Sequence, residues 1–205
     1  MISPSEALDR LREGNERFVA QRSRESNPTT EREKQASPQA PFATILSCSD
    51  SRVPPEQVFD VGIGDLFVVR VAGNLAAETQ IASVEFAAAE FGVPLVVVLG
   101  HSRCGAVLAT LEQLRQTKES PPPGHLGAIL DRVRPALTEI DMSEQAEPSS
   151  SLVAKAVRLN VEASVDRLCS DSPILRELID QERLRVVAAV CSLETGAVEF
   201  WDQSG

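Results

Sequence analysis

Short hydrophobic runs alternate along this chain with longer segments in which hydrophobic residues recur at helical spacing. The runs at residues 43–47, 65–72 and 93–99 have the length of strands that are buried on both faces of a parallel sheet. The segments with helical composition are residues 3–20, 76–91, 103–116, 126–137 and 151–169, with shorter helical pieces near residues 53–59 and after Ser172. The alternation predicts an α/β fold.

The C-terminal part of the chain departs from this alternation. Residues 185–190 and 197–201 are two strand-like runs joined by the short segment Leu193-Glu194-Thr195-Gly196, and so tight a connection makes the second strand antiparallel to the first. We therefore predict a central sheet of about four parallel strands plus an antiparallel edge strand, flanked by helices.

The N-terminal region begins with a helix signal and continues as a polar stretch. Ser3, Pro4 and Glu6 form the pattern of a capping box with proline at the first helical position. Residues 21–41 are polar and without periodicity, and a structureless segment of this length is uncommon inside a compact domain. We expect the N-terminal helix and this arm to pack on a partner subunit.

Length and charge narrow the class of protein. A chain of 205 residues fits one domain, which we divide into an N-terminal helix and arm (1–41) and an α/β core (42–205). The net charge of −10 argues against nucleic-acid binding. No run has the length of a membrane span, and the first residues lack the pattern of a secretory signal, so we expect a cytoplasmic protein.

Two short segments carry groups that can bind a metal. Cys48-Ser49-Asp50-Ser51-Arg52 follows the first strand-like run, and His101-Ser102-Arg103-Cys104-Gly105 follows the third. Ligands of open α/β sheets bind beyond the carboxyl ends of the strands, so neighbouring strands would bring Cys48, Asp50, His101 and Cys104 together as a ligand set suited to zinc. The alternative is that the two cysteines are small buried hydrophobic residues and the histidine a hydrogen-bonded turn residue.

The remaining cysteines and the second histidine lack such neighbours. Cys169 and Cys191 are interpreted as buried structural thiols, and His125, after a proline-rich loop, as a solvated turn residue. Four cysteines in a chain of this length are too few for a disulfide framework.

Through these segments the chain resembles a β-class carbonic anhydrase. The segments 48–54 and 100–105 are similar to the two signature motifs of that family, and further similarity extends through residues 64–74, 83–86 and 11–18. The resemblance covers nearly the whole chain.

The resemblance implies one Zn2+ per subunit and the reversible hydration of carbon dioxide to bicarbonate and a proton. Cys48, His101 and Cys104 match the permanent zinc ligands. Asp50 matches an aspartate that either ligates zinc in a closed form or pairs with the arginine matching Arg52, and we expect the pair to orient zinc-bound hydroxide.

The resemblance also implies a substrate pocket, part of which comes from a second subunit. The matching positions are Gln39, Phe67, Ala72, Phe86 and Gly105. Ala72 and Phe86 replace a more usual valine and tyrosine. Arg70 matches an arginine of a regulatory bicarbonate pocket, but Ile45 stands in place of its tryptophan and the chain has no tyrosine. We predict an open site without that regulation.

The sequence is also compatible with two alternatives to carbon dioxide hydration. Relatives with the same fold and zinc set hydrolyse carbonyl sulfide or carbon disulfide, and the chain is also compatible with a non-catalytic zinc- or bicarbonate-binding module. The resemblance further implies a homodimer or homotetramer. The net charge and the lack of a membrane-length apolar run lead us to expect no nucleic-acid or membrane partner.

Overall fold

The computed structural model describes residues 2–24, 39–115, 124–138, 140 and 148–202. Within these ranges five strands form one sheet in the order β2-β1-β3-β4-β5. Their bounds are β1 Ala43–Ser47, β2 Leu66–Arg70, β3 Leu95–His101, β4 Arg185–Cys191 and β5 Val198–Trp201. The first four are parallel, and β5 runs antiparallel to β4. The predicted α/β class and antiparallel edge are confirmed.

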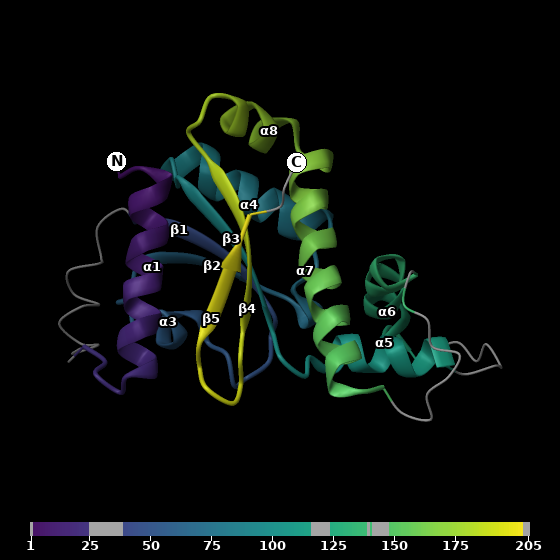
Figure 1. Cartoon of the computed structure of the whole chain (residues 1–205). Helices are drawn as coiled ribbons and strands as arrows, with labels where there is room; N and C mark the ends of the chain where they lie inside the picture. Colours follow the sequence, from purple (N-terminus) through teal and green to yellow (C-terminus); the bar gives the residue numbers. More distant parts are fainter. Residues whose placement is uncertain (1, 25–38, 116–123, 139, 141–147, 203–205) are drawn as a thin grey trace.

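Helices cover both faces of the sheet (Figure 1). They are α1 Pro4–Val19, α3 Pro55–Val58, α4 Glu78–Phe91, α5 Gly105–Arg115, α6 Gly127–Val133, α7 Ser150–Asp171 and α8 Pro173–Asp180, with short 3-10 turns η1 Ala72–Asn74 and η2 Arg134–Leu137. One hydrophobic core joins α1 and α3 to the sheet, and a second joins α4, α7 and α8 to the opposite face. None of the helices in the described ranges combines the length and apolar composition needed to cross a bilayer.

The first helix has a core within its own chain. The capping box predicted at Ser3 is present, and Ala7, Leu8 and Leu11 are buried against the sheet. Asn15 anchors the C-terminal half of α1, because its side-chain amide donates to the carbonyls of Val58 and Gly196. The arm expected to reach a partner falls mostly on residues 25–38, outside the described residues.

A few element boundaries differ from those expected from the sequence. Strand β3 includes His101, because the parallel ladder with β4 continues to Cys191. Helix α5 begins at Gly105, so Cys104 immediately precedes it. The helix expected over residues 126–137 consists of α6 and η2, and the change coincides with Pro135, which lacks the backbone N–H of a regular helix.

Candidate metal centre and active site

Three potential zinc ligands meet where neighbouring parallel strands end. Cys48 directly follows β1, His101 is the last residue of β3, and Cys104 precedes α5. Strands β1 and β3 are paired, with Ser47 opposite Leu99, so the side chains beyond their carboxyl ends face the same region. This confirms the predicted meeting of the two segments.

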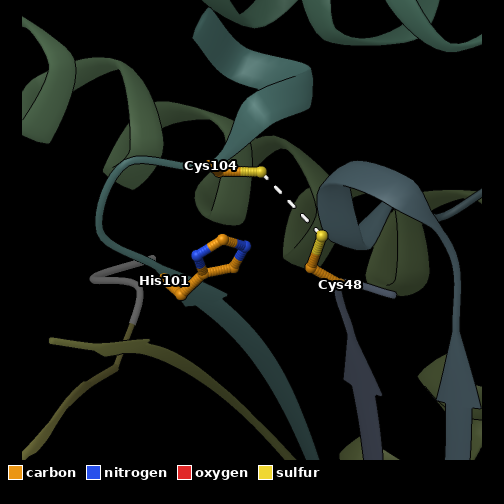
Figure 2. A group of neighbouring side chains, drawn as sticks. All are labelled: Cys48, His101 and Cys104. Carbon is orange, nitrogen blue, oxygen red and sulfur yellow. Dashed lines mark hydrogen bonds between the residues drawn. The ribbon is translucent and has the colours of Figure 1, made fainter. Parts of the chain in front are cut away.

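The three side chains form a compact, buried cluster (Figure 2). One ligand atom from each lies within 4.8 Å of the other two, and the Sγ atoms of Cys48 and Cys104 are 4.0 Å apart. Two thiolates bound to one tetrahedral zinc at about 2.3 Å would be about 3.8 Å apart. The observed spacing therefore fits a shared metal ion.

The His101 ring provides an independent test of this fit. Its Nδ1 lies 3.0 Å from the carbonyl oxygen of Ser102, and a carbonyl only accepts hydrogen bonds, so Nδ1 carries the proton. Nε2 is left with a lone pair, and it is buried without a hydrogen-bond partner. A buried acceptor of this kind is expected where a histidine ligates a metal.

The two cysteine side chains influence each other's protonation, because their sulfur atoms are 4.0 Å apart. The hydrogen bond from Cys104 is the largest cause that holds the pKa of Cys48 far below its ordinary value, and the N–H of Gly73 adds a 3.4 Å contact to the same sulfur. The hydrogen bond to Cys48 and burial raise the pKa of Cys104. One thiolate is thus already favoured, which suits a ligand that must be deprotonated to bind zinc.

Asp50 lies beside this cluster but pairs with Arg52. Arg52 donates from Nε to Oδ1 at 2.9 Å, from Nη2 to Oδ2 at 2.7 Å, and from its backbone N–H to Oδ1 at 3.0 Å. These hydrogen bonds hold the pKa of Asp50 well below its usual range, although partial burial opposes them. The carboxylate Oδ2 is 3.8 Å from Nε2 of His101, too far for a hydrogen bond.

The backbone around the first ligand is fixed by side chains from other elements. Arg70, at the end of β2, donates to the carbonyls of Cys48 and Asp50 at 3.1 and 2.7 Å. Asn160 of α7 donates to the carbonyl of Gly73, whose own N–H points at Cys48. Arg70, which matches the arginine of a regulatory pocket that we do not expect in this chain, therefore supports the segment that carries Cys48 and Asp50.

The residues predicted to contact substrate fall into two groups. Ala72 lies in η1, beside the Gly73 N–H that contacts Cys48, and Gly105 is exposed at the start of α5, where an added Cβ would meet nothing within 4 Å. Phe67 and Phe86 instead contact each other and Phe91 on the face covered by α4. The side chain of Phe86 is 52% exposed, and Gln39 is also exposed.

Sequence reasoning missed several residues that support the centre. Glu194 lies in the β4–β5 connection and accepts a hydrogen bond from Ser102, next to the ligand His101. Its sequence separation of 92 residues from Ser102 leaves no local signal, and the same holds for Asn160. Cys191 is buried as expected, Cys169 is only half-buried, and His125 is an exposed turn residue.

A doubly covered, mainly parallel sheet with a Cys-His-Cys cluster at its carboxyl edge defines a class of α/β zinc proteins. Comparison with known proteins is consistent with this class. A family model described as carbonic anhydrase matches residues 43–198. Carbonic anhydrase 2 of Mycobacterium tuberculosis is 34% identical over 99% of this chain and 95% of its own length. The carbonic anhydrase of Mycolicibacterium smegmatis is 42% identical over 66% of this chain and 65% of its own.

Similar solved structures indicate to which class of the carbonic anhydrase family the chain belongs. The Coccomyxa β-carbonic anhydrase in complex with acetazolamide aligns with a TM-score of 0.72 and 27% identity, covering 97% of this chain and 86% of that one. A tetrameric β-carbonic anhydrase of Sordaria macrospora aligns at 0.70 and 27% identity, covering 82% and 84%. The chain belongs to the carbonic anhydrase family, in its β class.

Proposed function

We propose that this chain converts carbon dioxide and water reversibly to bicarbonate and a proton, with one zinc ion held by Cys48, His101 and Cys104. The observation that carries the proposal is the buried cluster of two sulfurs and the unpartnered Nε2 of His101, all within 4.8 Å. Two thiolates and one imidazole are a set of three protein ligands that zinc enzymes use when they keep a fourth position open.

Zinc in such a site supplies a Lewis acid that makes water nucleophilic near neutral pH. Asp50 supplies the orientation: an ionised carboxylate only accepts hydrogen bonds, so the reacting water must direct a hydrogen at it and a lone pair toward carbon dioxide. Arg52 keeps Asp50 ionised and in place through its planar, permanently charged guanidinium.

The proposed substrate space lies beside Ala72 and Gly105. The open space in front of Gly105 supports this, because a side chain there would intrude next to the ligand Cys104. For Gln39, Phe67 and Phe86 we propose a role in the site of a second subunit. Within one chain, Phe67 lies opposite Thr44 in the β1–β2 ladder, and Thr44 is four residues before Cys48. Phe86 packs on Phe67 and not on the metal cluster.

This division predicts a homodimer or homotetramer. The exposed aromatic surface at Phe86 supports it, since solvent-facing aromatic groups are typical of interfaces. The similar Sordaria macrospora protein is described as tetrameric. The cytoplasmic location and the division into an arm (1–41) and a core (42–205) stay predictions from the sequence.

The test is stopped-flow measurement of proton release after the zinc-loaded protein is mixed with carbon dioxide. We expect catalysis well above buffer, and a loss of about 10²-fold or more in Asp50→Asn, which keeps the shape of the side chain but not its charge. Zinc content should be equal in both proteins. A zinc-loaded protein with no activity above buffer would refute the proposal.

A further inference from the structure

The orientation of His101 depends on one backbone carbonyl. The Ser102 oxygen accepts the Nδ1–H of His101 at 3.0 Å and thereby directs Nε2 toward the two cysteine sulfurs. The His101 side chain is fully buried, and among the described residues its Nε2 has no hydrogen-bond partner. Whatever fixes the Ser102 backbone therefore fixes the ligand.

Ser102 is held by the segment that follows β4. Its backbone N–H donates to the carbonyl of Cys191 at 2.9 Å. Its hydroxyl accepts a hydrogen bond from the Leu193 N–H at 2.9 Å and donates to Oε2 of Glu194 at 2.9 Å. The hydroxyl thus uses both its donor and its acceptor capacity, which defines the position of the residue from two directions.

The neighbouring Arg103 is tied to the same carboxylate. Its Nη2 lies 2.5 Å from Oε1 of Glu194, while Oε2 accepts the hydrogen bond from the Ser102 hydroxyl. Arg103 has a φ of 54°, in the left-handed region that is unfavourable for a residue with a side chain. This turn allows His101 and Cys104, three residues apart, to face one metal position. Glu194 therefore holds the turn at two successive residues.

We propose that Ser102 and Glu194 are positioning residues for the zinc ligand His101. Neither residue belongs to the cluster of Cys48, His101 and Cys104. They act on the carbonyl and the turn that set the direction of Nε2, and the inference rests on the proposed binding of zinc by Cys48, His101 and Cys104. Outer groups that orient a histidine ligand typically contribute 10- to 100-fold to metal affinity.

A purely structural role for Glu194 is the competing explanation, and the chain offers a matched control. Asp202 also lies near the C-terminus, is similarly exposed, and forms an exposed ion pair, accepting from Nε and Nη2 of Arg185 at 3.1 and 2.5 Å. Arg185 begins β4, at the end of the strand opposite to Cys191 and the metal cluster. Loss of Asp202 should loosen the C-terminal strands without affecting His101.

The experiment compares Ser102→Ala, Ser102→Thr, Glu194→Ala, Glu194→Gln and Asp202→Ala with the unmodified chain. Zinc affinity is measured by competition with a chromogenic chelator at fixed pH, and ligand geometry by the visible spectrum of the cobalt-substituted protein. We expect Ser102→Ala to bind zinc about 10- to 100-fold more weakly with an altered cobalt spectrum, and Glu194→Ala to show a smaller loss of about 10-fold. Ser102→Thr and Glu194→Gln, which keep the hydroxyl and the acceptor oxygen, should recover most of the affinity.

Unchanged zinc affinity and cobalt spectrum in Ser102→Ala would overturn the inference. If Ser102→Ala does not fold, the exposed Glu194→Ala decides, and affinity equal to that of the unmodified chain overturns it. An equal loss in Asp202→Ala would also overturn it, because the effect would then be general loosening. Failure of the unmodified chain to bind zinc would instead refute the proposed function.

Discussion

Replacing Arg52 with alanine removes two of the three hydrogen bonds that hold the Asp50 carboxylate beside the metal cluster. Of the three donors to the Asp50 carboxylate described above, only the backbone N–H of residue 52 would remain, at 3.0 Å. The side-chain hydrogen bonds at 2.9 and 2.7 Å are the largest cause of the low pKa of Asp50, so that pKa should rise toward its ordinary value.

The geometry shows what the freed carboxylate can do. Two nitrogen or oxygen ligands about 2.1 Å from a tetrahedral zinc are separated by about 3.4 Å. Oδ2 of Asp50 is already 3.8 Å from Nε2 of His101, so a small movement brings it to the separation expected of a fourth ligand. We therefore infer that the contact with Arg52 keeps Asp50 from becoming a fourth ligand.

We therefore expect Arg52→Ala to retain zinc but to lose about 10²- to 10³-fold in turnover, within the range for loss of a positioned group that handles protons. Arg52→Lys should recover only part of this, because an ammonium group cannot reproduce the planar, bidentate contact. The assays are stopped-flow carbon dioxide hydration and metal analysis, with the cobalt-substituted spectrum reporting a fourth protein ligand.

The matched control is Arg185→Ala. Arg185 makes a similar two-point contact with Asp202, but at the opposite end of β4 from the metal cluster. It should leave turnover unchanged. Turnover of Arg52→Ala equal to that of Arg185→Ala would refute the role assigned to the Asp50–Arg52 pair.

Three further predictions concern stability. Gly100→Ala would place a Cβ 2.5 Å from Cγ2 of Val161 and should lower the free energy of unfolding by about 1 to 3 kcal/mol. Gly105→Ala faces open space and should leave the free energy of unfolding unchanged. Urea denaturation measures both variants, and equal values would contradict the packing argument. Burial raises the pKa of Asp60, but the Arg17 side chain and the backbone N–H of residue 24 outweigh burial and lower it. Asp60→Asn should therefore lower the free energy of unfolding by about 2 kcal/mol at neutral pH. This difference should shrink as the pH falls below about 4, the ordinary pKa of an aspartate, and through the lower pKa of Asp60 in the folded state. A difference that does not change with pH would argue against an ionic contribution. Zinc at 100 times its dissociation constant should add about 2.7 kcal/mol, so a chelator should lower the thermal midpoint, and an unchanged midpoint would exclude coupling between metal binding and folding.

The sequence predicted the sheet and the metal cluster because both depend on local patterns. The apolar runs identify β1 and β3, and the ligands directly follow or end these strands, so their meeting needs only the rule that parallel strands share a carboxyl edge. The Asp50–Arg52 pair is also local, because the two residues are only two positions apart in the sequence.

The supports of the cluster were not predictable in the same way. Ser102 and Glu194 are 92 residues apart in the sequence, and Asn160 and Gly73 are 87 residues apart. Hydrophobic periodicity predicts only local structure and gives no sign of contacts this distant. Phe86 shows a related limit: its helical spacing is compatible with either a buried or an exposed position, and the structure leaves half of the side chain in solvent.

The contact between Asn15 and the β4–β5 connection has a consequence for the order of folding. Asn15 bonds to Gly196 and Val198 across 181 and 183 residues, and the connection in turn carries Glu194, which holds the turn beside His101. During synthesis the first helix must wait for the last strands before this contact forms, and contacts so distant in sequence form slowly. A full-affinity metal centre is therefore expected only once the β4–β5 connection has been made, so chains that end at residue 191 should bind zinc poorly even though all three ligands are present.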